Sequence, residues 1–353
     1  MLASNSTVIA YIIMFVFVVG FIVYAFSNRS ATKPEIGSEI ELAPNRRPYY
    51  DDEALEGKRL ETVQFVGLLF LIVSVVGLPL YWILEPNRQA GAVEMDQRRA
   101  IGWGKELFAP TAEGGFNCSG CHGGMKGEGG VAVWANTDPK TNQVTSVNWF
   151  APALNTALYR FSEDEVRFIL VYGRPFSPMS PWGLEGGGPM NFQQINNLIA
   201  YIASIQIDRA GCAAGDDNLK TCDGGTLPAE LQDEITEQAQ ISIDNGTYQS
   251  MGEALFNLDL NSGAYSCARC HTTGWSYGNP GVPGGGAMGP DLAGGASVIR
   301  FPVESDQIAF VAAGSELGKK YGLQSQGSGR MPGFGQMLTA EQIKLIVEYV
   351  RSL

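Results

Sequence analysis

Two short motifs of cysteine and histidine are the residues of this chain best suited to chemistry. Residues 116–124 read FNCSGCHGG and residues 266–272 read SCARCHT, so each contains C-x-x-C-H. The two motifs use both histidines and four of the six cysteines in the 353-residue chain. Each motif places two thiols about one helical turn apart, with a metal-ligating imidazole directly after the second thiol.

Covalent haem attachment is the chemistry that this arrangement favours. Two thiols can form thioethers with the vinyl groups of haem, and the following histidine can ligate the iron from the same side. A zinc site needs four ligands, whereas each motif supplies three and the chain has no other histidine. A thioredoxin-like pair would lie in a βαβ pattern, which is absent. We therefore expect two covalently bound haem c groups. Their anchors are Cys118, Cys121 and His122 in the first motif and Cys267, Cys270 and His271 in the second.

The sixth ligand of each iron must then come from another residue type. Methionine is the usual substitute for a second histidine, and it raises the reduction potential. Met179 in GRPFSPMSPWG and Met331 in GSGRMPGFG lie in loops rich in glycine and proline, which is not typical of a methionine that fills a core. Met190 lies too close to a predicted helix, and Met125 and Met288 are on the wrong side of the sequence order. We expect Met179 and Met331 to be the sixth ligands.

A proline stands between histidine and methionine in each half, as Pro152 in FAPALN and Pro290 in MGPDLA. A metal-bound imidazole usually donates its second N–H to a carbonyl group, which fixes the orientation of the ring. The carbonyls of Pro152 and Pro290 suit this role for His122 and His271, because proline has a fixed φ angle and no N–H of its own.

The segments around the motifs repeat along the chain. A G-x-x-x-F pattern precedes each motif, as Gly104 to Phe108 and as Gly252 to Phe256. Each repeat ends in an amphipathic helical pattern, NFQQINNLIAYIASIQ in the first and LTAEQIKLIVEYVRSL in the second. A tandem duplication is the simplest account of this order.

This order of features resembles class I cytochrome c, once over residues 96–208 and again over residues 247–353. The resemblance implies small all-α domains whose first and last helices cross closely at Gly104 and Gly252. It also places four aromatic residues near the crossings, namely Phe108, Tyr201, Phe256 and Tyr349. The expected fold class is all-α, with two tandem class I cytochrome c domains after an N-terminal membrane hairpin.

Two apolar runs precede the repeats. Residues 8–26 contain no charge, and residues 63–84 contain Gln64 as their only strongly polar residue. Each run is close to the ~20 residues that a helix needs to cross a bilayer. Basic residues gather in the loop between the runs, so the positive-inside rule places that loop in the cytoplasm and both the N-terminus and the repeats outside. The N-terminus lacks the basic region and cleavage site of a signal peptide. We expect residues 1–86 to form a two-helix anchor in a bacterial plasma membrane, with the haem domains periplasmic.

Residues 209–246 between the repeats are polar and acidic, and they are predicted to be a linker with a short helix. Cys212 and Cys222 lie here, outside the C-x-x-C pairs. In an exported domain, two such cysteines favour a disulfide, although a redox-active or ligand cysteine is the alternative. The net charge of −12 argues against a nucleic-acid partner and suits a basic docking partner.

The whole chain resembles membrane-anchored dihaem cytochromes of bacterial respiratory complexes. Examples are subunit III of cbb3-type cytochrome oxidases and the dihaem cytochrome of actinobacterial quinol:cytochrome c reductases. The resemblance implies a non-catalytic subunit that passes single electrons from the quinol:cytochrome c reductase side to the terminal oxidase side, with other subunits of these complexes as partners.

Two other functions remain open from the sequence: a dihaem enzyme, and a docking or structural subunit in which one haem is not a relay. A dihaem oxidoreductase resembling thiosulfate dehydrogenase needs a cysteine ligand, which Cys212 or Cys222 can supply. A cytochrome c peroxidase usually needs extra histidines, which the chain lacks. The anchor also resembles that of the copper-bearing subunit II of haem–copper oxidases, but the histidines and the cysteine pair of a copper site are missing.

Overall fold

The computed structural model divides the chain into two compact units, Met1–Asp96 and Gln97–Leu353. The structure describes residues 5–28, 57–137, 141–174, 177–212, 222, 224–316, 319–321, 325–326 and 331–353.

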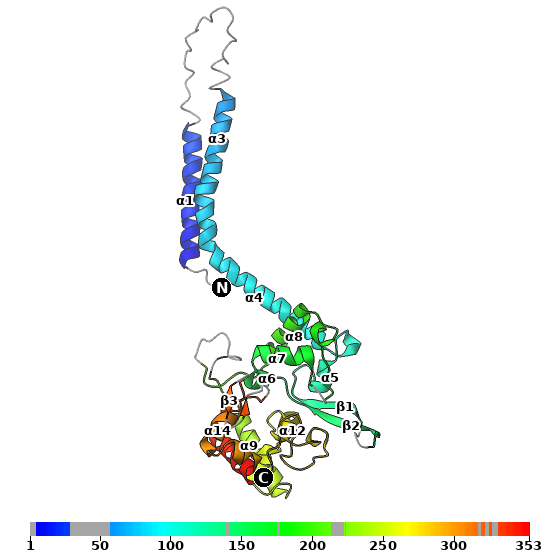
Figure 1. Ribbon diagram of the computed structural model, residues 1–353. Coiled ribbons are helices and arrows are strands. Elements are labelled where there is room, and N and C mark those ends of the chain that lie inside the picture. Colours follow the sequence, from blue (N-terminus) through cyan, green and yellow to red (C-terminus); the bar gives the residue numbers. More distant parts are fainter. Residues whose placement is uncertain are drawn as a thin grey trace, which may run out of the picture. The chain divides into compact units, whose positions relative to one another are not determined.

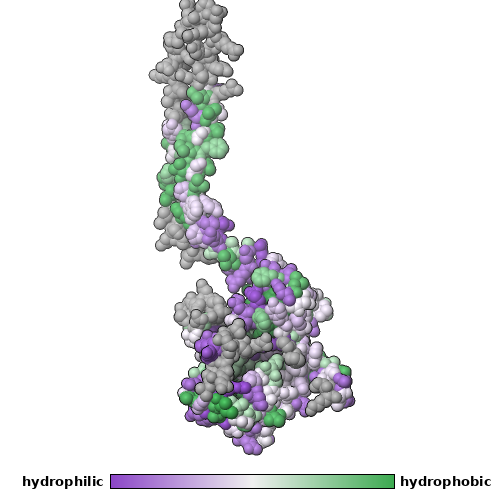
Figure 2. Space-filling view, viewed as in Figure 1, coloured by the Kyte–Doolittle hydropathy of each residue, from purple (hydrophilic) through white to green (hydrophobic). Residues whose placement is uncertain are grey.

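Apolar helices make up most of the described part of the first unit. Helix α1 (Asn5–Asn28) lies along α3 (Lys58–Ile72), with the rings of Phe21 and Phe65 5.6 Å apart (Figure 1). A π-helical turn joins α3 to α4 (Leu78–Phe108), which ends in the second unit. The helical stretch Leu60–Phe108 is long and apolar enough to cross a membrane, and the apolar part of α1 covers Tyr11–Ser27. Apolar side chains of this unit are exposed, as the green surface of Figure 2 shows.

The first half of the second unit holds the first cysteine motif. Its helices are α5 (Cys118–His122), α6 (Ala157–Arg160), α7 (Glu163–Tyr172) and α8 (Phe192–Ser204), which follow the end of α4. Gly104 of α4 touches α8 so closely that a Cβ there would lie 1.9 Å from the carbonyl oxygen of Asn197. The rings of Phe108 and Tyr201 meet at this crossing, 5.2 Å apart.

The second half repeats this crossing with different helices. Its helices are α9 (Ala229–Asp244), α10 (Met251–Phe256), α11 (Leu260–Gly263), α12 (Ala268–His271), α13 (Ala296–Arg300), α14 (Glu304–Ala313) and α15 (Ala340–Ser352), with short strands β3 (Lys320–Tyr321) and β4 (Ser325–Gln326). A Cβ on Gly252 of α10 would lie 2.2 Å from the carbonyl oxygen of Leu345 in α15. The rings of Phe256 and Tyr349 are 5.4 Å apart.

Buried apolar side chains form two clusters in this unit, one centred on each crossing. The second cluster also takes in Ile235 and Ala239 of α9, both fully buried, and Leu227 just before that helix. The region expected to be a polar linker is therefore partly core. The reason is that the polar residues of 229–244 cover only the outer face of α9, while its inner face packs on α10.

A β-hairpin interrupts the first half, which the all-α expectation did not include. Strand β1 (Gly130–Thr137) pairs antiparallel with β2 (Val144–Ala151), in register from Gly130 with Ala151 to Thr137 with Val144 (Figure 1). Both strands contain β-branched and aromatic residues, which favour extended backbone. The hairpin packs on the second half, since Trp149 lies 5.2 Å from Tyr277 and Phe150 lies 5.8 Å from Trp275, measured between ring centroids.

Candidate haem-binding sites

The first cysteine motif forms a single helical turn, α5. Asn117 before it and Gly123 after it both have a positive φ, 62° and 83°, so the chain turns sharply into and out of the motif. Burial raises the pKa of the Cys118 thiol to about 11 and also raises that of Cys121. Both thiols are therefore protonated at neutral pH, and they lie three residues apart in one helical turn.

His122 is oriented by the proline that the sequence singled out. Its Nδ1 lies 2.9 Å from the carbonyl oxygen of Pro152. Burial lowers the pKa of His122 to about 4, so the ring is neutral at physiological pH. A neutral imidazole that donates from Nδ1 has its lone pair on Nε2, which is the form that binds a metal.

The second motif has the same arrangement. His271 Nδ1 lies 2.9 Å from the carbonyl oxygen of Pro290. Gly289 packs against the face of this ring, because a Cβ there would lie 2.6 Å from His271 Cε1. Burial lowers the pKa of His271 and raises that of the Cys267 thiol to about 12. The backbone therefore holds both histidines in the neutral form with one ring nitrogen committed to a carbonyl.

The first predicted methionine ligand follows a glycine that ends a helix. Helix α7 stops at Gly173, whose φ is 69°, and a Cβ there would lie 2.5 Å from the carbonyl oxygen of Met179. That oxygen accepts from the Arg174 N–H at 2.8 Å. Met179 packs against the same buried cluster as Cys118, so the structure brings the methionine and the first motif into one half. Met190, by contrast, is fully buried in that cluster.

The second predicted methionine lies in an equivalent setting. Helix α14 stops at Gly314, whose φ is 79°, and a Cβ there would lie 2.8 Å from the carbonyl oxygen of Met331. Ser315 closes the loop, because its N–H donates to the Met331 carbonyl at 2.9 Å and its Oγ accepts from the Met331 N–H at 3.2 Å. Met331 packs against the buried cluster that contains Cys267 at its edge.

An arginine beside the sites was not anticipated from the sequence. Arg160 is buried, and its pKa is lowered by burial to about 10, yet it has no acidic partner among the described residues. Its Nε has no hydrogen-bond acceptor in that part of the chain. A buried cation with an unused donor is costly unless an anionic group pairs with it. Haem carries two carboxylates, so this donor suits the group that the cysteines are expected to hold.

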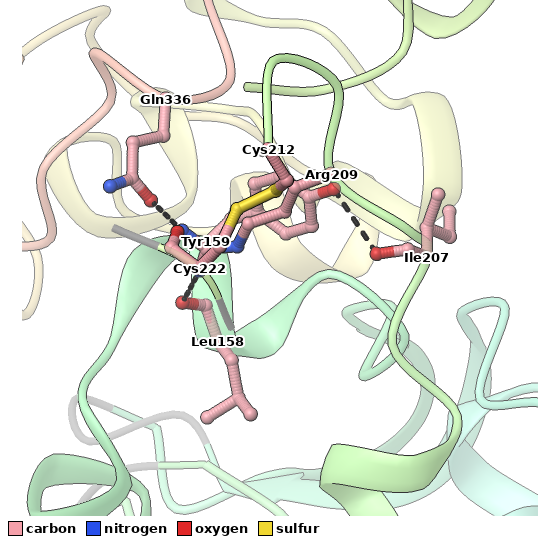
Figure 3. Close-up of a disulfide and its surroundings, with 7 residues drawn as sticks. All are labelled: Leu158, Tyr159, Ile207, Arg209, Cys212, Cys222 and Gln336. Carbon is pink, nitrogen blue, oxygen red and sulfur yellow. Dashed lines mark hydrogen bonds between the residues drawn. A yellow bond between two sulfur atoms is a disulfide. The ribbon is translucent and has the colours of Figure 1, made fainter. Parts of the chain in front are cut away.

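A disulfide joins Cys212 and Cys222 in the segment between the halves, with their Cα atoms 6.0 Å apart. Arg209 lies against it and donates to the carbonyls of Leu158 and Cys222 at 2.5 and 3.3 Å (Figure 3). Its guanidinium also lies 4.5 Å from the centre of the Tyr159 ring. The disulfide is therefore part of a packed junction, and neither sulfur is a free thiol.

Comparison with known proteins identifies part of this unit. Residues 250–353 match the family model for cytochrome c. No curated protein and no solved structure matches the chain. The matched segment contains Cys267, Cys270, His271, Pro290 and Met331. The second half is thus a cytochrome c domain, which implies covalently bound haem c and haem-based electron transfer.

Proposed function

We propose that the chain is a membrane-anchored cytochrome c with two haem groups, and that it passes single electrons between the quinol:cytochrome c reductase side and the terminal oxidase side of a bacterial respiratory chain. The observation that carries the proposal is the structural equivalence of the two halves. Only the second half matches the family model, but the first half reproduces its histidine, proline and glycine contacts.

The equivalence extends to helix lengths and caps. Helices α7 and α14 both have 10 residues, and each ends at a glycine with positive φ before its methionine. Helices α8 and α15 both have 13 residues and begin with a capping box, led by Asn191 and Thr339. Such agreement in elements that surround a C-x-x-C-H motif supports a second cytochrome c domain over residues 96–208.

The residues of each half have distinct tasks in this proposal. Two cysteines would anchor the porphyrin, the histidine would bind the iron, and the proline carbonyl holds the imidazole ring in orientation. The methionine would be the second protein ligand of the iron and would favour its reduced state. When bound, haem supplies a one-electron couple between ferric and ferrous iron, while the protein sets its potential through ligands, burial and nearby charge.

The first unit serves as the anchor. We infer that α1 and the helix from Leu60 onward cross the bacterial plasma membrane as a hairpin, with the loop between them cytoplasmic and the haem domains periplasmic. The exposed apolar side chains of both helices support this placement. Membrane attachment would hold the haem domains close to other respiratory subunits, which are the proposed partners.

The disulfide weighs against the alternative of an enzyme resembling thiosulfate dehydrogenase. Such an enzyme needs a cysteine as an iron ligand, and the two candidates, Cys212 and Cys222, are bonded to each other.

Haem stoichiometry tests the proposal directly. A pyridine haemochrome assay on the purified chain should give two covalent haems per polypeptide. Cys118→Ala/Cys121→Ala should reduce the count to one and leave the second haem spectrum intact, and Cys267→Ala/Cys270→Ala should do the converse. Replacing Cys212 and Cys222 by serine is the matched control and should keep the count at two. A wild-type value of one would contradict the dihaem proposal.

A further inference from the structure

Four consecutive residues of the first half, Phe150–Ala153, are hydrogen-bonded to side chains beside both cysteine motifs. Three of their carbonyl groups accept hydrogen bonds from side chains that surround the two motifs. The pairs are Phe150 O with Arg269, Pro152 O with His122, and Ala153 O with Arg160. The segment that orients the histidine of the first motif is therefore held in place by two arginines.

Arg269 belongs to the second half but reaches into the first. It stands between the two cysteines of the second motif. Its Nη1 donates to the carbonyl of Ser262 at 2.8 Å, and its Nη2 donates to the carbonyl of Phe150, 119 residues earlier in the chain. Arg269, inside the second motif, thus bonds to a residue that lies two positions before Pro152, the proline that orients His122.

Arg160 makes the reverse connection. It is the last residue of α6 in the first half, and its Nη2 donates to the Ala153 carbonyl at 2.6 Å. Its Nη1 donates at 3.2 Å to the carbonyl of Ala264, which is 104 residues further along and three residues before Cys267. Each half therefore supplies one guanidinium that bonds to the backbone of the other.

Both guanidiniums remain charged where they lie. Arginine side chains stay protonated at neutral pH, so both are cations. No carboxylate in the described part of the chain pairs with either one.

We propose that Arg269 and Arg160 are positioning residues that couple the two haem sites across the boundary between the halves, so that each arginine controls the reduction potential of the haem in the opposite half. This inference rests on the proposed function, because it requires a haem in each half. A fixed cation opposes the oxidised, more positive iron, and a fixed carbonyl sets the hydrogen bond of the ligating imidazole. Loss of Arg269 therefore favours ferric iron at the first site.

The expected size follows from the charge alone. At an effective dielectric constant of about 20, a unit charge about 10 Å away changes a one-electron equilibrium by about tenfold. For a one-electron couple, a tenfold change corresponds to about 59 mV. Shifts of this order are resolved in an optical redox titration.

The experiment separates the two haems by changing one sixth ligand at a time. A Met331→His background should lower the potential of the second haem, so the remaining high step belongs to the first haem, and Arg269→Gln is measured on that step. A Met179→His background isolates the second haem in the same way, and Arg160→Gln is measured there. Arg300→Gln is the matched control, because Arg300 donates to Asp291 O within its own half.

The proposal predicts that Arg269→Gln lowers the reduction potential of the first haem, so that the Fe(III)/Fe(II) ratio at a fixed applied potential rises about tenfold. It also predicts that Arg160→Gln lowers that of the second haem, and that Arg300→Gln leaves the first haem unchanged. Arg269→Lys should cause a smaller downward shift, since it keeps the charge but loses the two-donor fork. This lysine variant carries the test if the glutamine variant binds fewer than two haems. Shifts confined to the haem of the mutated half would overturn the inference, whereas a wild-type haem count of one would overturn the proposed function instead.

Discussion

Arg209 and Gln336 meet across 127 positions of the chain, with Arg209 Nη1 2.6 Å from Gln336 Oε1. The same arginine bonds to the Leu158 carbonyl in the first half and to the Cys222 carbonyl beside the disulfide. The backbone of Gln336 also accepts from the Leu227 N–H at 2.9 Å. One buried guanidinium therefore fastens the first half, the connecting segment and the second half together (Figure 3).

Replacing this arginine should loosen the junction without touching either haem. Arg209→Met keeps the length of the side chain but removes its donors, which should lower the free energy of unfolding by ~3 kcal/mol. Gln336→Ala removes one acceptor and should cost ~1.5 kcal/mol, and the double variant should lose less than the sum because the two residues interact. Chemical denaturation followed by circular dichroism measures all three. Additive losses would mean that the pair is not coupled.

The disulfide should contribute to stability but not to the redox centres. Cys212→Ser/Cys222→Ser opens a loop with a sequence separation of 10 residues, and we expect a loss of ~2–3 kcal/mol. Both haem spectra and both potentials should stay as in the wild type. An altered spectrum would assign one of these cysteines to an iron and revive the enzyme alternative.

The helix crossings should not tolerate a methyl group. Gly104→Ala and Gly252→Ala each place a Cβ within 2.2 Å of a backbone oxygen, so the helices must move apart, at a cost of ~2–3 kcal/mol or more. Gly102→Ala lies on the same helix as Gly104 with nothing within 4 Å of its Cβ, and it should be neutral or stabilising. Thermal melts of the three variants are compared directly. Equal melting temperatures for Gly102→Ala and Gly104→Ala would refute the close crossing.

The two methionines should each control one haem. Met179→Leu should abolish the methionine–iron charge-transfer absorption of the first haem and lower its potential, and Met331→Leu should do the same for the second. Met190→Leu is the control, because this buried methionine packs in the core and a swap of similar volume should leave both spectra unchanged. An unchanged spectrum for Met179→Leu would redirect the assignment to another residue of the first half.

Acid should destabilise the haem-free chain through His122. The folded pKa of about 4 lies below the ordinary value of 6.5, so between these values the unfolded chain binds a proton that the folded chain does not. Stability contributed by the neutral ring is present above pH 6.5 and is lost as the pH falls towards 4. Unfolding of the haem-free protein across this range measures the loss, and His122→Gln should make it smaller. A pH-independent wild type would contradict the burial of this ring.

The contacts within each half are those the sequence predicted well. The histidine–proline pairs follow from motif spacing and from the need of a ligating imidazole for an acceptor, and the structure contains both at 2.9 Å. The glycine crossings follow from the resemblance to class I cytochrome c, and the structure contains both of them.

The contacts between the halves could not be predicted in this way. In the sequence, Arg160 and Arg269 cannot be told from ordinary surface arginines. Nothing within a few residues of either one shows that it bonds to a carbonyl 104 or 119 positions away. The hairpin was missed because its alternation is weak: Val131 and Val133 alternate in β1, but the valines of β2, Val144 and Val147, lie three residues apart. The sequence next to the two methionines does not show that Gly173 and Gly314 are equivalent. These glycines precede their methionines by different distances, six and 17 residues.

Strand β2 contains Phe150 and leads to Ala153, the two residues that the arginines hold, and this limits how the protein can be divided into fragments. A fragment that begins at residue 247 keeps the second motif complete, but it lacks Phe150, the acceptor of Arg269, and Arg160, the donor to Ala264. A fragment that ends before the linker loses the same bonds from the other side. The repeats have therefore become complementary parts, and neither can be exchanged for a copy of the other.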